Sequence, residues 1–70
     1  MTFQEFLDLN RKHRFEGYGY DESEVYDKKG NILTCWYEND PKYQAKVLRI
    51  LPLSETLVKI VIDYDKENEV

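Results

Sequence analysis

The sequence predicts a single small α+β domain, mainly β, in which one N-terminal helix accompanies a strongly bent antiparallel sheet of about four strands. Three observations lead to this prediction: helical signals over about residues 2–14, strand and turn signals over 24–65, and a length of 70 residues, which suits one domain. We expect the helical part to span 1–16 and residues 66–70 to form a frayed polar tail.

The helix is predicted from its start signal and its apolar face. Thr2 and Glu5 have the spacing of a capping box, in which each side chain accepts a hydrogen bond from the other residue's backbone amide. One face carries apolar side chains, namely Phe3, Phe6 and Leu7. The basic run 11–14 lies in the last turn, where positive charge complements the helix dipole. We therefore interpret this run as a source of helix stability and solubility rather than as a site for an acidic ligand.

A β-hairpin is predicted after the helix. Residues 24–26 and 32–37 are rich in β-branched and aromatic side chains, and they flank the turn-like segment 27–31. In that segment Asp27 stands at the start of the turn and Gly30 near its end, which suits a type I turn with a bulge. The two flanking segments are therefore expected to pair.

The pattern of residues 43–51 leaves two alternatives open after a turn at 39–42. In a helix, Asp40 would be the cap and Pro41 would occupy the first position. In a strand, the alternation breaks at Leu48, and a β-bulge would explain the break. Periodicity slightly favours the helix, whereas the family resemblance described below favours the strand, which we adopt.

Residues 56–64 are the clearest strand of the chain. They are rich in β-branched residues and alternate regularly. One face carries Val58, Ile60, Ile62 and Tyr64.

Composition and charge restrict the partner. Fourteen acidic and ten basic residues give a net charge of −4, which repels phosphate groups and disfavours direct binding of nucleic acid. A protein or peptide of basic character is the expected partner. No stretch approaches the roughly 20 apolar residues that span a bilayer. The single cysteine, Cys35, excludes an internal disulfide, which fits an intracellular location, cytoplasmic or nuclear.

Catalytic chemistry has few groups available in this chain. The only histidine, His13, lies on the basic end of the helix, away from any nucleophile that the pattern identifies. Cys35 is expected mid-strand among apolar neighbours, where a thiol is buried and inert. One cysteine and one histidine do not form a metal site. We therefore expect a protein that is not an enzyme and that uses neither metal nor cofactor.

Aromatic residues are abundant, at 14% of the chain, and three of them stand at expected strand ends: Trp36, Tyr43 and Tyr64. If sheet curvature brings these rings together, their faces attract an alkylated cation, by about 0.5–2 kcal/mol per ring. Acidic residues follow nearby in the sequence and would favour a positive ligand: Glu38, Asp40 and Asp63. The alternative is that the rings only cover a small core.

The segment 34–47 resembles the first hairpin of Tudor domains, with the survival motor neuron protein's domain as the nearest type and the chromo-barrel as a related alternative. It contains a tryptophan, an acidic turn and a tyrosine two residues before an alanine. Residues 58–64 resemble the strand that follows, so the resemblance covers roughly 31–65. It implies an SH3-like partial barrel that binds methylated arginine or lysine in an aromatic cage. The matching cage positions are Trp36, Tyr43 and Tyr64.

The chain departs from the Tudor pattern in several places. A further cage aromatic expected near Val61 is missing, and Asp65 and Lys66 stand where glycine and asparagine are usual. Residues 1–30 have no counterpart in the family.

Two hypotheses follow, and both concern binding rather than catalysis. The first is a Tudor-like module that recognises a basic, possibly methylated, segment through the three rings and their acidic surroundings. The second is a small stand-alone acidic inhibitor or adaptor, of the type that phages and mobile elements encode, which binds a host protein. A homodimer that completes its sheet across a two-fold axis is compatible with either hypothesis.

Overall fold

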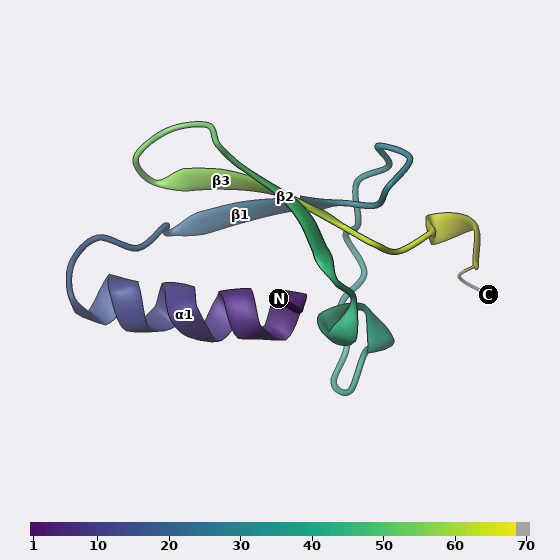
Figure 1. Cartoon of the computed structure of the whole chain (residues 1–70), viewed down its shortest axis with the longest axis horizontal. Coiled ribbons are helices and arrows are strands. Elements are labelled where there is room, and N and C mark those ends of the chain that lie inside the picture. The colour runs from purple at the N-terminus through teal and green to yellow at the C-terminus, as the bar shows by residue number, and fades with distance from the viewer. Residues whose placement is uncertain (69–70) are drawn as a thin grey trace.

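The computed structural model describes residues 1–68 and contains one helix packed against an open three-stranded sheet (Figure 1). The elements in chain order are α1 (Phe3–Phe15), β1 (Glu22–Tyr26), the 3-10 turn η1 (Pro41–Gln44), β2 (Val47–Pro52), β3 (Leu57–Ile62) and the 3-10 turn η2 (Lys66–Asn68). The prediction of an α+β chain with an N-terminal helix is confirmed.

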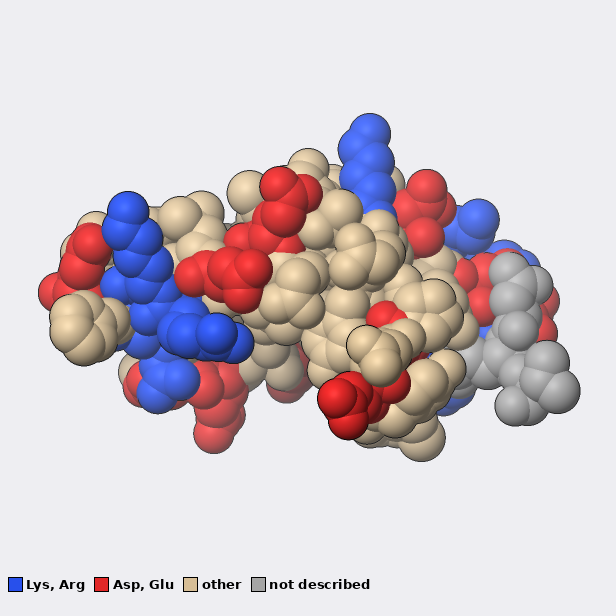
Figure 2. All heavy atoms as spheres, turned by 90° about the horizontal axis from the view of Figure 1, so that it is seen from below, with Lys and Arg blue, Asp and Glu red and all other residues tan. Residues whose placement is uncertain are grey.

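Helix α1 begins with the predicted capping box. The Thr2 hydroxyl accepts from the Glu5 amide at 3.1 Å, and the Glu5 carboxylate accepts from the Thr2 amide at 2.9 Å. The helix ends at Phe15, shortly before Gly17, whose φ of +97° suits a residue without Cβ. Lysine and arginine side chains gather over the C-terminal half of α1, as predicted for the run 11–14 (Figure 2).

The sheet order is β1-β3-β2, and the sheet is mixed. Strands β2 and β3 are antiparallel, as predicted, whereas β1 pairs with β3 in parallel, with Val25 opposite Ile60. The expectation of an antiparallel sheet of about four strands is therefore wrong for β1, and residues 1–68 contain three strands that do not close into a barrel. Strand β2 makes this topology possible, because it runs antiparallel to β3 and returns the chain to the end of the sheet at which β1 begins. The connection over 27–46 takes the chain from the end of β1, past β3, to the start of β2.

The predicted hairpin between 24–26 and 32–37 forms only its turn. Gly30 has a φ of +89° and donates its amide to the Asp27 carbonyl at 3.1 Å. Beyond the turn, pairing with β1 stops after an isolated bridge between Tyr26 and Ile32 and one bond from the Leu33 amide to the Val25 carbonyl.

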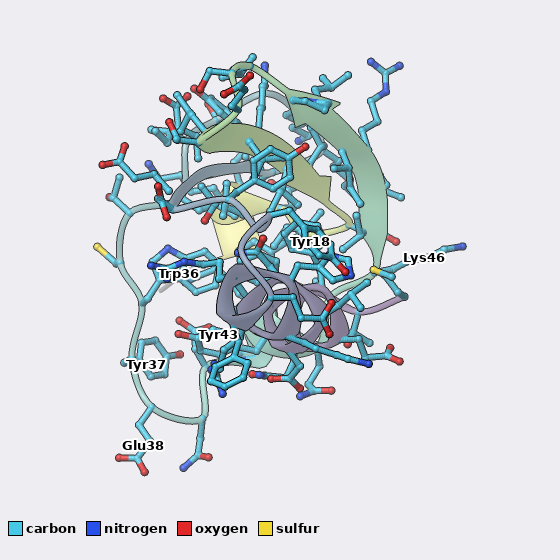
Figure 3. All side chains as sticks on the ribbon, turned by 90° about the vertical axis from the view of Figure 1, so that its left-hand side faces the viewer. Tyr18, Trp36, Tyr37, Glu38, Tyr43 and Lys46 are labelled. Atoms are coloured by element: carbon cyan, nitrogen blue, oxygen red, sulfur yellow. The ribbon has the colours of Figure 1, made fainter. Side chains whose placement is uncertain are left out.

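Residues 32–37 leave the sheet because their apolar side chains are used elsewhere. Leu33 is buried in the core, and Trp36 packs beside the start of α1 against Phe3 (Figure 3). Cys35 lies between them with its side chain exposed, so the expectation of a buried, mid-strand thiol is wrong.

Each alternative for residues 43–51 is right for one part of the segment. Asp40 caps η1 and Pro41 occupies its first position, as in the helical alternative, but η1 is a single 3-10 turn. The chain then becomes strand β2, and a register shift between Val47 and Arg49 is the bulge that the strand alternative predicted. Tyr43 consequently lies on the turn and not on a strand.

The core lies between β3 and α1. The predicted strand is confirmed over Leu57–Ile62, and its alternate residues Val58, Ile60 and Ile62 are completely buried. Four further residues complete the core: Phe3, Phe6, Val25 and Leu33. Burial of such side chains stabilises a fold by about 1.5–3 kcal/mol each, so this central strand carries much of the stability.

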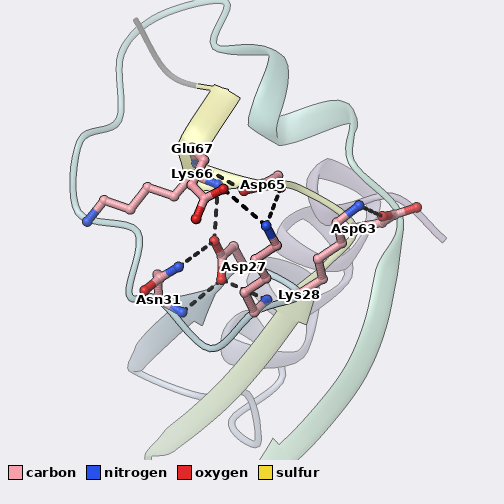
Figure 4. A network of polar contacts seen from close by, with 8 residues as sticks. Asp27, Lys28, Asn31, Asp63, Asp65, Lys66 and Glu67 are labelled. Atoms are coloured by element: carbon pink, nitrogen blue, oxygen red, sulfur yellow. Dashed lines mark hydrogen bonds and ion pairs between the residues drawn. The ribbon is translucent and has the colours of Figure 1, made fainter.

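The end of the described chain is held by the buried carboxylate of Asp27 (Figure 4). Asp27 accepts from the backbone amides of Lys29 at 2.9 Å, Asn31 at 2.7 Å and Lys66 at 3.0 Å. It therefore connects the turn after β1 to η2. Of the segment predicted as a frayed tail, residues 66–68 form the 3-10 turn η2, and residues 69–70 lie outside the described part of the chain.

Asp27 also accepts a side-chain hydrogen bond from Asn31 at 3.1 Å. Burial acts to raise the pKa of the Asp27 carboxyl, but the amide bonds from Lys66, Asn31 and Lys29 outweigh it and lower the pKa to about 2.

We expect Asp27→Asn to lower the free energy of unfolding by about 1–3 kcal/mol at pH 7, because an amide cannot accept this set of bonds. The pKa of Asp27 is depressed in the folded state, so the ionised carboxylate stabilises the wild type above about pH 4 and less as the pH falls toward 2. Urea unfolding between pH 2 and 7 measures both effects.

Asp63→Asn, whose exposed side chain lies 3.9 Å from Lys28, is the matched control and should change stability by less than about 0.5 kcal/mol. Equal effects of the two variants would contradict this role of Asp27.

Candidate functional site

Three aromatic rings surround the side-chain ammonium group of Lys42. The Lys42 Nζ lies 5.2 Å from the ring centroid of Trp36, 5.6 Å from that of Tyr37 and 5.4 Å from that of Tyr64. Two of the three predicted cage residues, Trp36 and Tyr64, therefore meet around a cation, and that cation belongs to the chain itself. These distances are in the range at which ring faces attract a positive charge.

Lys42 is held in this position by Asp40. The two side chains are almost completely buried and form an ion pair of 2.9 Å, and the Asp40 carboxylate also accepts the Lys42 amide at 3.0 Å. Burial acts to raise the pKa of Asp40, but the bonds from Lys42 lower it below its ordinary value. Asp40 was predicted to add negative charge that favours a positive ligand. The structure instead uses that charge to neutralise Lys42.

Tyr43 lies on another side of Trp36. The centroids of these two rings are 5.1 Å apart, and Tyr43 stacks with Phe3 at a centroid distance of 6.1 Å and an interplanar angle of 5°. Phe3 also lies 5.2 Å from Trp36. Phe3, Trp36 and Tyr43 thus form one aromatic cluster beside α1.

The other two predicted acidic residues lie apart from one another. Glu38 is exposed at the tip of the loop before η1 and points away from the body of the protein (Figure 3). Asp63 is exposed after β3, where it pairs with Lys28 (Figure 4). The predicted acidic surroundings of the rings are therefore reduced to the single buried carboxylate of Asp40.

The aromatic cluster forms part of a surface groove of about 440 Å³. The groove runs between the first half of α1, the middle of β1 and residues 32–36. Its lining is mostly apolar: Phe3, Leu7, Ser23, Glu24, Val25, Ile32, Leu33, Thr34, Trp36 and Tyr43. Glu24 is the one charged residue in this lining, and its carboxylate lies at the rim, where it accepts a hydrogen bond from the Tyr26 hydroxyl at 3.0 Å.

Strand β1 contributes an open edge to the groove. The Val25 carbonyl points away from β3, because it accepts the Leu33 amide at 2.8 Å. Backbone groups alternate sides along a strand, so Ser23, two residues earlier, directs its amide and carbonyl to the same outer side. A peptide in the groove would find both apolar surface and backbone hydrogen-bonding groups there.

Three residues of these clusters were missed as site residues in the sequence: Phe3, Tyr37 and Lys42. Phe3 was assigned only to the helix face, and Tyr37 would point away from Trp36 in a strand. The signal for Lys42 was present in part, because Asp40 and Pro41 predicted a capped turn. Nothing in that pattern indicates that a lysine two residues after the cap becomes buried.

The described residues contain no group of three or more side chains arranged to hold a metal ion. No helix within residues 1–68 has both the length and the apolar character needed to cross a membrane. His13 lies against the ring of Tyr18 at a centroid distance of 4.9 Å.

Comparisons of the chain with models of known protein families, with curated proteins and with solved structures give no match. The resemblance to Tudor domains therefore rests on the residues quoted for it above.

We expect Lys42→Met to lower the free energy of unfolding by about 3 kcal/mol, because it leaves the buried Asp40 carboxylate without its ion-pair partner. Lys46→Met is the matched control, since Lys46 is exposed and points away from the rings (Figure 3), and it should change stability by less than about 0.5 kcal/mol. Urea unfolding at pH 7 measures both. Adding Asp40→Asn to Lys42→Met should recover part of the loss, and a purely additive double variant would argue against direct coupling of the two side chains.

Proposed function

We propose that this protein is a non-catalytic binding module that takes an extended segment of a partner protein, with apolar and basic side chains, into the groove beside β1. The observation that carries the proposal is the coincidence of three features in one place. These are the aromatic cluster of Phe3, Trp36 and Tyr43, the outward backbone groups of β1, and the charge of Glu24.

Each feature corresponds to one part of such a ligand. A segment that adds beside a strand gains backbone hydrogen bonds, and its alternate side chains enter whatever pocket lies along the edge. The apolar lining receives an aliphatic or aromatic side chain, since such grooves gain most from burying apolar surface. Glu24, together with the net charge of −4, favours a lysine or arginine next to that side chain. An adaptor or inhibitor that captures a host protein would act in this way.

The test selects peptides from a random library on the immobilised chain. We expect enrichment of sequences that alternate apolar and basic residues. Titration of the strongest peptide should change the emission of Trp36, the only tryptophan, which lines the groove. Glu24→Lys should weaken this peptide about tenfold by replacing an attractive charge with a repulsive one. Glu55→Lys, in the exposed loop between β2 and β3, is the matched control and should bind as the wild type does. Enrichment of acidic peptides, or equal affinity of both variants, would count against the proposal.

A second candidate function is recognition of a methylated lysine or arginine by the rings around Lys42. One observation favours it: the rings of Trp36, Tyr37 and Tyr64 already lie around a cation. A methylated side chain would have to displace Lys42, because Lys42 occupies that space.

This second function predicts that a peptide with trimethyl-lysine binds more tightly than the same peptide with unmodified lysine. It also predicts that binding shifts the NMR signals of the Lys42 side chain, which groove binding leaves in place. Equal binding of the two peptides, with unchanged Lys42 signals, would eliminate methyl recognition and leave the groove proposal intact.

A further inference from the structure

Strand β2 forms an exposed apolar edge of the sheet. It is the outermost strand in the order β1-β3-β2, and every one of its residues except Val47 is exposed. The exposed fractions are 46% for Leu48, 41% for Ile50 and 40% for Leu51. Exposed apolar edges pair with other strands unless something covers them.

The free part of this edge is short and bounded at both ends. At its start, the Val47 amide donates to the Met1 carbonyl at 2.8 Å, and Thr2 forms an antiparallel bridge with Lys46. At its end, Pro52 has no amide to donate. Residues 48–52 remain, and Ile50 stands at their centre.

The central residue directs its backbone outward. The Leu53 amide donates to the Leu57 carbonyl at 3.0 Å and so faces the β3 side. Since backbone groups alternate along a strand, Leu51 also faces β3, whereas the amide and carbonyl of Ile50 point away from the sheet. These two groups can form a reciprocal pair of hydrogen bonds with an identical residue related by a two-fold axis.

We propose that β2 is the interface of a homodimer, in which residues 48–52 of two copies pair antiparallel about Ile50. We assign this edge to a second copy of the chain, because two such edges, bounded at the same residues, can pair in a symmetric register. Ile50 faces Ile50 of the second copy, Leu48 faces its Pro52, and Arg49 faces its Leu51. No charge lies directly opposite a like charge, and β2 contributes no acidic residue to the interface of a chain whose net charge is −4.

Dimerisation joins the two sheets through β2 and leaves both β1 edges at the outer ends. If the groove beside β1 binds as proposed above, the dimer carries two such grooves and binds a repetitive partner bivalently. The dimer itself does not depend on that function.

The test is sedimentation equilibrium of the whole chain over a range from micromolar to millimolar concentration. We expect a reversible rise from the mass of one chain to that of two, together with slower hydrogen exchange of the Ile50 amide as the dimer forms. Ile50→Lys places a charge at the two-fold axis and should raise the dissociation constant about 100-fold or more. Phe15→Lys is the control, since Phe15 is a 94% exposed apolar side chain on α1, and it should dimerise as the wild type does.

A wild type that stays monomeric at millimolar concentration overturns the proposal, as does a dimer that Ile50→Lys leaves unchanged. If β2 instead pairs only with added strands from other proteins, the exchange of the Ile50 amide slows only in their presence, which also overturns it. The groove is tested separately. Ile50→Lys should keep the affinity of a single groove for the selected peptide, and Glu24→Lys should still dimerise, so failure of one proposal is distinguishable from failure of the other.

Discussion

The burial of the Lys42 ammonium group is the interaction on which the arrangement of one end of the molecule depends. Removing an ammonium ion from water costs several kcal/mol unless an opposite charge and other favourable contacts replace the lost hydration. Here the Asp40 carboxylate provides the charge, and the rings of Trp36, Tyr37 and Tyr64 provide negative faces. Asp40 and the rings of Trp36 and Tyr37 come from the loop before η1. Lys42 itself lies in η1, and Tyr64 lies in the segment after β3. Keeping Lys42 satisfied therefore requires three parts of the chain to meet.

A second buried charge organises the neighbouring connections in a different way. Asp27 forms no ion pair within residues 1–68. It instead accepts hydrogen bonds from the turn after β1 and from the start of η2. Hydrogen bonds from amides stabilise a carboxylate strongly when it is shielded from water. Asp27 thus connects segments that lie far apart in the sequence, whereas Asp40 does so only through Lys42, whose ammonium group lies against the ring of Tyr64. The core within residues 1–68 has seven buried apolar residues, and such polar connections hold the loops that this core does not reach.

The mixed sheet gives the protein two edges of unlike character. The β1 edge lies beside a groove with an aromatic lining and one acidic residue, and it is partly covered by the contacts of Ile32 and Leu33. The β2 edge is apolar, without acidic residues, and covered only at its start by Met1 and Thr2. The central strand β3 separates them and is fully paired on both sides. The order of the strands therefore places two edges of different character on opposite sides of the central strand.

The sequence by itself determined the parts of this protein that depend on neighbouring residues. The helix with its capping box, the turn at 27–31, the capped turn at Asp40 and the alternating strand β3 were all predicted, because each arises from spacing within a few residues. Only the tertiary structure decided the parallel pairing of β1 and the departure of residues 32–37 from the sheet. It also decided the burial of Lys42 between three rings, of which two, Trp36 and Tyr64, were predicted to hold a ligand's cation. These features depend on which distant segments compete for the same core and the same charge, and that competition leaves no local pattern in the sequence.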